Sequence, residues 1–147
     1  MRALLQRVKY SVVSLAGEEV SRIGPGLLVL LGVAAEDEEK DLDWIADKLI
    51  NLRIFDDGKG KLNLSLIDVG GEIMVVSQFT LYGDARQGRR PGYTGAAPPE
   101  KGERFYLLFL DKLRERGLEP AAGVFGAHMQ LELVNDGPVT LMLDSRQ

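Results

Sequence analysis

The chain of 147 residues contains no cysteine and one histidine, His128. Without cysteine it can form neither a disulfide nor a thiolate nucleophile, and this composition fits a reducing compartment. One histidine with no cysteine beside it argues against a structural or catalytic zinc site. A histidine-activated serine would depend on His128 alone, and the Gly-x-Ser-x-Gly elbow is missing. We therefore expect no metal and no cofactor, and an ordinary surface or partly buried position for His128.

Long apolar segments are missing too. The longest apolar run, Leu27 to Leu31, is far shorter than the roughly 20 residues that a helix needs to cross a bilayer. Residues 1–7 lack the charged start, apolar region and cleavage site of a secretory signal. We therefore expect a cytoplasmic protein without a membrane partner.

The chain has fewer basic than acidic residues, 18 lysines and arginines against 22 aspartates and glutamates, which gives a net charge of −4. Sequence-independent binding along DNA needs a basic surface, so we expect no DNA partner. The charge is nevertheless uneven. Residues 84–95 carry Arg86, Arg89 and Arg90 against Asp84, and a local basic loop can hold a phosphate. A solvated loop with incidental arginines explains this composition equally well.

The length and the 45% hydrophobic and 27% charged fractions fit one globular domain spanning residues 1–147. A helical period of apolar residues predicts helices over 37–52 and 100–116. The balance of elements predicts an α+β domain in which a mainly antiparallel sheet curls toward a β-barrel and carries two long helices. Apolar and alternating patterns predict strands at 19–23, 27–33, 53–55, 73–81, 121–125, 130–134 and 139–143, with 27–33 at the centre. Residues 2–15 fit one long bent strand or two short ones, and residues 62–66 fit a short strand or an extended segment.

Two short segments concentrate polar groups at the ends of predicted strands. The first, Ser77-Gln78-Phe79-Thr80-Leu81, follows the buried run 73–76, and a rigid strand end is a good place to present polar groups to a substrate. The second, Asn135 to Thr140, is predicted to be a turn between two alternating strands. Hydroxyl and amide groups are weak bases, so such a site suits a bond that is already labile, for example an activated ester.

These two segments together resemble the signature pair of the D-aminoacyl-tRNA deacylase family. Similarity extends to the order and spacing of elements from Met1 to Leu143. The resemblance implies a D-aminoacyl-tRNA deacylase-like fold and a homodimer. It further implies an enzyme that hydrolyses the ester between a D-amino acid and the 3′-terminal adenosine of tRNA. Glycyl-tRNA would also be a substrate, whereas L-aminoacyl-tRNA would be spared. Further matching segments are Gln6-Arg7-Val8, residues 26–33, Arg53-Ile54-Phe55 and Met129-Gln130.

The resemblance assigns chiral selection to Asn135 to Thr140. The family's Gly-Pro bond is cis, which here is Gly137-Pro138, and it reaches across the dimer into the partner's pocket. There its two carbonyl groups meet the substrate's α-amino group, and an L side chain would clash with the turn. Arg7 is expected either to brace this turn through backbone carbonyls or to form only a surface ion pair.

The resemblance assigns the ester-holding wall to Ser77, Gln78, Phe79 and Thr80, where backbone N–H groups would form an oxyanion hole. Thr80 is a candidate nucleophile, but no residue in the motif is placed to act as its base. We therefore expect Thr80 to position the ester, while the 2′-hydroxyl of the RNA helps to activate water or the ester. Phe79 is expected with equal weight in the site or in the core.

Two other functions remain open from the residues. A non-catalytic module that binds an RNA end or a nucleotide would use the same groove, and it would protect the ester instead of accelerating its loss. A general esterase for D-amino-acid derivatives would act on small esters that lack RNA.

Overall fold

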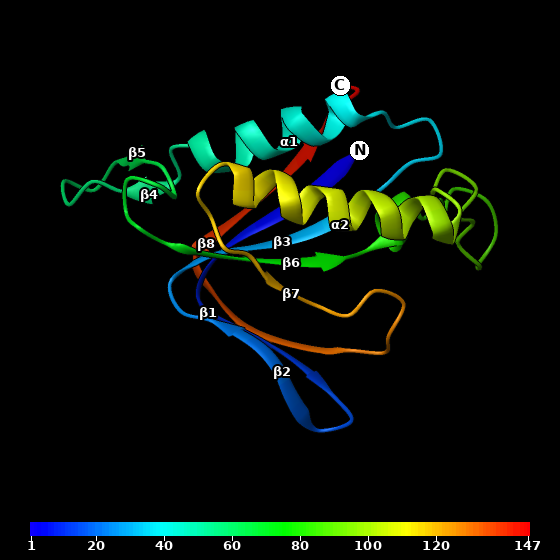
Figure 1. Ribbon diagram of the computed structural model, residues 1–147, viewed down its shortest axis with the longest axis horizontal. Coiled ribbons are helices and arrows are strands. Elements are labelled where there is room, and N and C mark those ends of the chain that lie inside the picture. The colour runs from blue at the N-terminus through cyan, green and yellow to red at the C-terminus, as the bar shows by residue number, and fades with distance from the viewer.

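The computed structural model describes all 147 residues. Its main part is a six-stranded sheet covered on one face by two helices (Figure 1). The sheet order is β2-β1-β3-β6-β7, with β8 paired to β1, and β4 and β5 form a separate hairpin. The fold class predicted from the sequence is confirmed. The elements are β1 (Arg2–Leu15), β2 (Glu18–Ile23), β3 (Gly26–Gly32), α1 (Glu39–Asn51), β4 (Phe55–Asp56), β5 (Leu62–Leu64), β6 (Glu72–Ser77), the 3-10 helix η1 (Phe79–Tyr82), α2 (Pro99–Glu115), β7 (Ala121–Ala122) and β8 (Gln130–Asp144).

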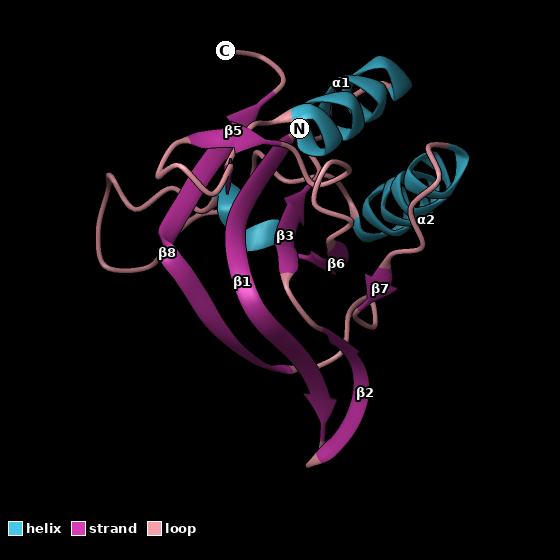
Figure 2. Ribbon diagram, turned by 90° about the vertical axis from the view of Figure 1, so that its left-hand side faces the viewer, coloured by secondary structure: helices cyan, strands magenta, loops and turns pink.

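Strand β1 explains why the sheet curls. Its first half pairs with β3, its second half pairs with β2, and β8 follows it along nearly its whole length (Figure 2). At the other end of the path, the Ser21 hydroxyl of β2 donates to the carbonyl oxygen of Ala122 in β7 at 2.8 Å. This bond joins the two ends of the strand order, so the sheet approaches a barrel.

The two central strands are buried on both faces. In β3, Leu27, Val29 and Leu31 pack in the core beneath the helices, whereas Leu28 packs in the smaller core inside the curled sheet. Strand β6 lies parallel to β3 and alternates in the same way. Burial on both sides accounts for the continuous apolar runs in their sequences, which is the pattern of parallel strands. The sheet is therefore antiparallel around β1 and parallel from β3 to β7.

The predicted strand over 73–81 is wrong beyond Ser77. The amide of Gln78 still donates to Leu31 of β3, at 2.8 Å, but the next residues coil into η1. The amide of Leu81 then donates to the carbonyl of Gln78 at 3.3 Å, which closes the turn. The chain thus leaves the sheet four residues before the apolar pattern stops.

The segment from Asn135 to Thr140 is not a turn between two strands that reverse direction. Asn135 pairs with Val8 and Thr140 pairs with Gln6, so β8 runs antiparallel to β1 on both sides of the segment. The residues between them bulge out of one continuous strand, opposite Arg7. A Gly-Pro pair flanked by alternating residues fits a hairpin and a bulge equally well, and only the pairing with β1 distinguishes them.

Smaller differences concern element ends. Helix α1 begins at Glu39, because Glu38 and Asp41 form a capping box in which each side chain accepts from the other's backbone N–H. The strand predicted over 121–125 is limited to Ala121–Ala122. Neither α1 nor α2 has the length and apolarity that a membrane-spanning helix requires.

The close approach of β3 and β6 generates a stability prediction. A Cβ atom on Gly26 would lie 1.9 Å from the carbonyl oxygen of Glu72, which is a backbone atom of a neighbouring strand. Gly26→Ala should therefore lower the free energy of unfolding by about 3 kcal/mol or more in urea denaturation. Gly24→Ala is the matched control, because its Cβ would meet only a side-chain oxygen at 3.8 Å. Its cost should be about 1 kcal/mol or less, and equal losses in the two variants would contradict the account.

Candidate active site

A pocket of about 740 Å³ opens where β6 ends. Its walls come from the ends of β3 and β6, the loop before α2, the first turn of α2 and the segment between β7 and β8. Ser77, Gln78 and Phe79 are among its lining residues. The others are Leu31, Val33, Val76, Tyr93, Thr94, Ala96, Ala97, Pro98, Pro99, Gly102, Phe125, Gly126, Ala127, His128, Met129 and Leu131.

A second pocket, of about 700 Å³, lies at the start of β6 and the end of α2. It contains none of the residues predicted for the site, and its arginines are held in ion pairs, Arg22 with Glu19 and Arg116 with Asp43 and Asp47. The pocket at the end of β6 is therefore the candidate active site.

The pocket wall beyond Ser77 is the tight turn η1, which packs closely against Gly32 of β3. A Cβ atom on Gly32 would lie 3.1 Å from the carbonyl oxygen of Gln78 and 3.2 Å from Leu81 and Tyr82. A side chain here would make contacts tighter than usual, so η1 would have to move by a few tenths of an ångström away from β3. Within the turn, the Gln78 side-chain amide donates to the Thr80 hydroxyl.

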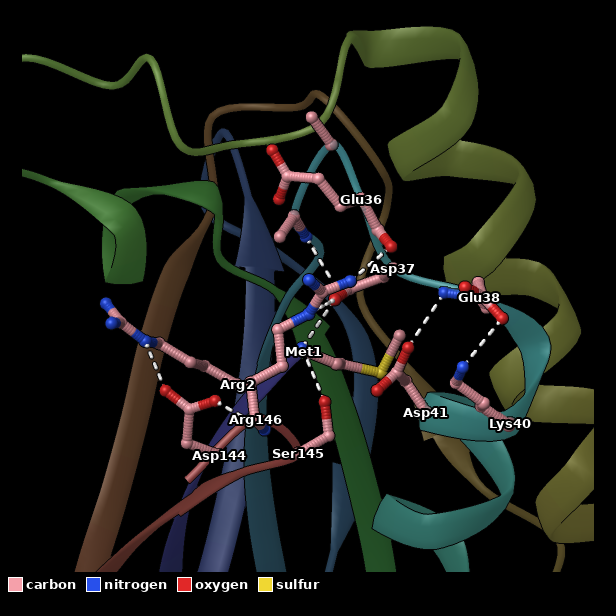
Figure 3. A network of polar contacts seen from close by, with 12 residues as sticks. Met1, Arg2, Glu36, Asp37, Glu38, Lys40, Asp41, Asp144, Ser145 and Arg146 are labelled. Atoms are coloured by element: carbon pink, nitrogen blue, oxygen red, sulfur yellow. Dashed lines mark hydrogen bonds and ion pairs between the residues drawn. The ribbon is translucent and has the colours of Figure 1, made fainter.

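Arg2 fixes the far end of the same turn. Its Nη1 donates to the carbonyl oxygen of Leu81 at 2.9 Å, and its guanidinium lies 4.7 Å from the centre of the Tyr82 ring. Its Nε donates to Asp144 at 2.9 Å (Figure 3). Burial raises the pKa of the Tyr82 hydroxyl, and the nearby carboxylates of Asp37 and Asp144 add to this. Burial also acts to raise the pKa of Asp144, but hydrogen bonds from Arg2 and from the Arg146 backbone outweigh it and lower that pKa.

A buried ion pair ties the first strand to the loop after β3. The Met1 ammonium donates to Asp37 at 2.7 Å and to the Ser145 hydroxyl at 2.8 Å (Figure 3). Asp37 also accepts from the Ala34 amide at 2.7 Å and from Arg146 at 3.3 Å. The Asp37 side chain is fully buried and accepts hydrogen bonds on both oxygens, so its charge is compensated inside the protein. The network sets the position of β1, and with it the position of Arg2.

The bulge in β8 is held by two side chains. Arg7 donates from Nε to the carbonyl of Asp136 at 3.1 Å and from Nη1 to the carbonyl of Ile54 at 2.6 Å. Its side chain is 12% exposed and lies 3.5 Å from the Asp136 carboxylate, so it is not a surface residue. Asn135 spans the bulge, accepting from the Val139 amide at 3.1 Å and donating to the Thr140 hydroxyl at 2.8 Å.

Gly137 and Pro138 form the exposed tip of this bulge, and the peptide bond between them is cis. Gly137 has φ +127°, a backbone conformation that L side chains rarely adopt. A Cβ atom there would lie 2.9 Å from Arg7 Nη2 and 3.0 Å from Val139. Glycine at this position therefore allows Arg7 to approach the bulge.

The structure brings the first group of predicted residues together and leaves the second group elsewhere. Ser77, Gln78 and Phe79 line the pocket, and Thr80 follows them on the exposed side of η1. Phe79 is 56% exposed, so its predicted alternative place in the core is wrong. Asn135, Gly137 and Pro138 belong to the bulge on β8, and Arg7 of β1 holds this bulge. None of the four lines the pocket of the same chain.

Sequence reasoning missed several residues of the pocket. The Tyr93 ring meets the Phe79 ring edge-on at 5.1 Å between centroids, and it comes from a loop without a regular pattern. His128 is exposed, as expected, but belongs to the pocket lining. Tyr106 donates to the carbonyl oxygen of Val75 at 2.9 Å, two residues before Ser77, and burial raises its pKa to about 12. No group of three or more histidine, cysteine and acidic residues is arranged to hold a metal ion.

Comparison with known proteins identifies similar chains along the whole length. The family model described as D-Tyr-tRNA(Tyr) deacylase matches residues 4–144. Curated relatives named D-aminoacyl-tRNA deacylase include those of Thermosipho africanus, 54% identical, and Kosmotoga olearia, 55% identical. Each aligns over 147 residues, covering 100% of this chain and 99% of the relative.

Two solved structures share the fold. One is titled c-Myc DNA Unwinding Element Binding Protein, is 43% identical and superposes with a TM-score of 0.92 over 98% of both chains. The other is titled as a probable eukaryotic D-amino acid tRNA deacylase and has a TM-score of 0.83 over 97% of both chains. At 20% identity the second likeness concerns the fold alone.

Proposed function

The chain belongs to the D-aminoacyl-tRNA deacylase family and is a hydrolase, and we propose that it acts as a homodimer in the cytoplasm. The substrate is tRNA carrying a D-amino acid or glycine on its 3′-terminal adenosine, and the products are the free amino acid and tRNA. L-aminoacyl-tRNA is rejected by a Gly-Pro bulge that the partner subunit inserts into the pocket.

The observation that carries this proposal is the separation of the two polar segments within one chain. Strands β1 and β3 lie between β8 and β6 in the sheet, which sets the bulge about 14 Å from β6 across the strands. Along the strands, Arg7 pairs with Leu27 whereas Ser77 pairs with Leu31, which adds about 13 Å. The bulge therefore cannot complete the pocket of its own chain, and a second copy is needed to supply it.

The outer surface of β8 supports a partner at this edge. Strand β8 pairs only with β1, so its other edge is open. Val134 on one side of the bulge, and Leu141 and Met142 on the other, are 38%, 38% and 49% exposed. Apolar residues on an open strand edge are typical of an edge that another chain covers.

The pocket wall supports ester hydrolysis without a side-chain nucleophile. The N–H groups in the first turn of a helix have no acceptor within the helix, so those of Phe79 and Thr80 at the start of η1 are suited to an ester oxyanion. The Thr80 hydroxyl accepts from Gln78, an amide that cannot act as a base. Thr80 therefore positions the ester, and the adjacent 2′-hydroxyl of the RNA helps to activate the attacking water.

The rigid backbone of the bulge supports the proposal that L-aminoacyl-tRNA is rejected by steric exclusion of its side chain. One hydrogen bond from Arg7 to the carbonyl of Asp136 and two contacts of Asn135 hold the backbone around Gly137 in one orientation, and a second bond from Arg7 to Ile54 fixes the guanidinium itself. Rigid carbonyl oxygens can hold an ammonium group, but they leave no room for a side chain on the same side of the α-carbon. Because backbone atoms read only the amino group, many D side chains are accepted.

A nucleic-acid-binding module without activity is the second candidate. It is favoured by the 43% identical structure whose title describes a DNA-binding protein. A binder slows the spontaneous loss of the ester by covering it, whereas an enzyme accelerates this loss, so turnover separates the two.

The test of the proposed function uses D-Tyr-tRNA and L-Tyr-tRNA under identical conditions. The protein should release D-tyrosine with multiple turnovers and leave the L ester at its spontaneous rate. The free ethyl ester of D-tyrosine serves as the control for a general esterase, and it should not be hydrolysed. Protection of both tRNA esters, or equal hydrolysis of both, would contradict the proposal.

Thr80→Ala tests whether this hydroxyl positions the ester or attacks it. Loss of a positioning group should lower kcat for D-Tyr-tRNA by roughly 10²–10³ or less, as for one oxyanion donor. Removal of a nucleophile would cost several orders of magnitude more. His128→Ala, also in the pocket, is the control for a hidden histidine base and should stay active. Complete loss of turnover in Thr80→Ala, with the fold intact by circular dichroism, would show that Thr80 is the nucleophile.

A further inference from the structure

Most arginines of the chain are neutralised by an acidic neighbour, and three of the four exceptions lie near the pocket. Ion pairs hold Arg2, Arg7, Arg22, Arg86, Arg114, Arg116 and Arg146. Arg53, Arg89, Arg90 and Arg104 have no such partner. Of these four, Arg89 and Arg90 lie in the loop that leads into the pocket wall, and Arg104 follows the pocket residue Gly102 on α2.

The loop that carries Arg89 and Arg90 is closed at its base. The backbones of Asp84 and Gly92 exchange two hydrogen bonds, each of 2.8 Å. Arg86 donates to Asp84 through Nε at 2.9 Å and through Nη2 at 2.6 Å, and hydrogen bonds from the Arg86 side chain and backbone lower the pKa of that carboxyl to about 2. The only acid of the loop is thus already paired, and the charges of Arg89 and Arg90 are unopposed.

The loop is fixed to the rim of the pocket. Gly92 closes it, and the next residue, Tyr93, lines the pocket and packs against Phe79. Arg89 and Arg90 are four and three residues from Tyr93, so their backbones lie within about 14 Å of the rim. In Figure 1 the loop lies at the end of the molecule where α2 begins, opposite the hairpin of β4 and β5.

The surroundings offer no other net positive charge. The chain as a whole carries −4. In the first turns of α2, Glu100 and Glu103 balance Lys101 and Arg104. An anion that approaches the pocket mouth therefore meets a local attraction only at the loop.

We propose that Arg89 and Arg90 bind the backbone phosphates of a single-stranded RNA 3′ end whose terminal nucleoside occupies the pocket. This inference rests on the proposed function, because it takes the RNA end as the pocket's ligand. A guanidinium matches a phosphate with two parallel N–H···O bonds, and it stays charged at every physiological pH. Contacts to phosphate carry no sequence information, so the loop positions the RNA without selecting one tRNA.

The experiment measures binding of a fluorescein-labelled RNA hairpin that ends in a single-stranded ACCA-3′ overhang. Anisotropy is recorded between 50 and 200 mM KCl for the unchanged protein and for Arg89→Gln/Arg90→Gln. Each lost contact with a single strand reduces the slope of log K against log salt by about 0.7. The double variant should therefore lose about 1.4 from the slope and bind roughly 10- to 30-fold more weakly near 0.1 M salt.

The matched control is Arg53→Gln/Lys61→Gln, which removes two unpaired positive charges next to and within the β4–β5 hairpin. It should keep the affinity and slope of the unchanged protein, because long-range attraction is screened at these salt concentrations. An equal loss in both double variants would assign the effect to net charge and overturn the inference. Unchanged binding in Arg89→Gln/Arg90→Gln would overturn it as well.

A turnover arm separates this inference from the proposed function. D-Tyr-tRNA is compared with 3′-D-tyrosyl-adenosine, which has the terminal nucleoside and no phosphates. In Arg89→Gln/Arg90→Gln the ratio of kcat/KM for the two esters should fall by the same 10- to 30-fold. Suppose that the unchanged protein hydrolyses neither ester, and that Arg89→Gln/Arg90→Gln binds the RNA hairpin more weakly than the unchanged protein does. The proposed function then fails and the phosphate contact stands. An unchanged ratio together with unchanged binding contradicts the phosphate contact.

Discussion

The parallel pairing of β3 with β6 is the constraint on which both parts of the site depend. The two strands are buried on both faces, and Gly26 lets their backbones approach so closely that a methyl group would overlap the carbonyl of Glu72. The register fixed by this contact places Ser77 opposite Leu31 at the strand exit. Through β1, the same sheet places Arg7 opposite the bulge of β8. The pocket wall and the bulge are thus held by one rigid body, at two separate positions.

Both parts use the same physical device, a backbone segment held by an arginine from β1. Arg2 donates to the carbonyl of Leu81 at the end of η1, and Arg7 donates to the carbonyl of Asp136 in the bulge. Each guanidinium is also close to a carboxylate, Asp144 or Asp136, that helps to orient it. Glycines complete each contact: a side chain on Gly32 would crowd η1, and one on Gly137 would collide with Arg7 and strain the backbone. Residues of strand β1 thus hold both segments of the candidate site in place.

Much of this fold could be predicted from the sequence, because it depends on local pattern. The helical stripes of α1 and α2 and the two-faced burial of β3 and β6 follow from the spacing of apolar residues. The curl of the sheet, predicted from the balance of elements, arises because β1 pairs with β3 in its first half and with β2 in its second. The end of β6 could not be predicted, since the apolar pattern continues into Phe79 and Leu81 while Gly32 and Arg2, far away in the sequence, decide where the chain turns. The bulge was predicted as a turn for a similar reason. Its local signals are those of a hairpin, and its direction depends on pairing with β1.

The residues of the candidate site likewise divide into those that local sequence predicts and those that it does not. Ser77, Gln78 and Phe79 lie next to one another in the sequence, so they were predicted as a group, and they line the pocket together. Tyr93 and Met129 line the same pocket, but they come from an irregular loop and from the segment before β8. The residues next to Tyr93 and Met129 in the sequence give no pattern that predicts a position in the pocket wall. Whether two subunits share the site, as we propose, is a question of assembly, and the spacing of residues in one chain does not answer it.

The most direct test of a site shared between subunits is a mixture of two strongly impaired variants. One carries Gln78→Ala and Thr80→Ala in the pocket wall, and the other carries Gly137→Val in the bulge. Each homodimer then has two defective sites. A hybrid dimer has one site in which an intact wall meets an intact bulge. After subunit exchange at equal concentrations, verified by native mass spectrometry, the account predicts recovery of about a quarter of the normal D-Tyr-tRNA hydrolysis, from half of the dimers with one site each. Absence of recovery despite complete exchange would contradict it and place the whole site within a single chain.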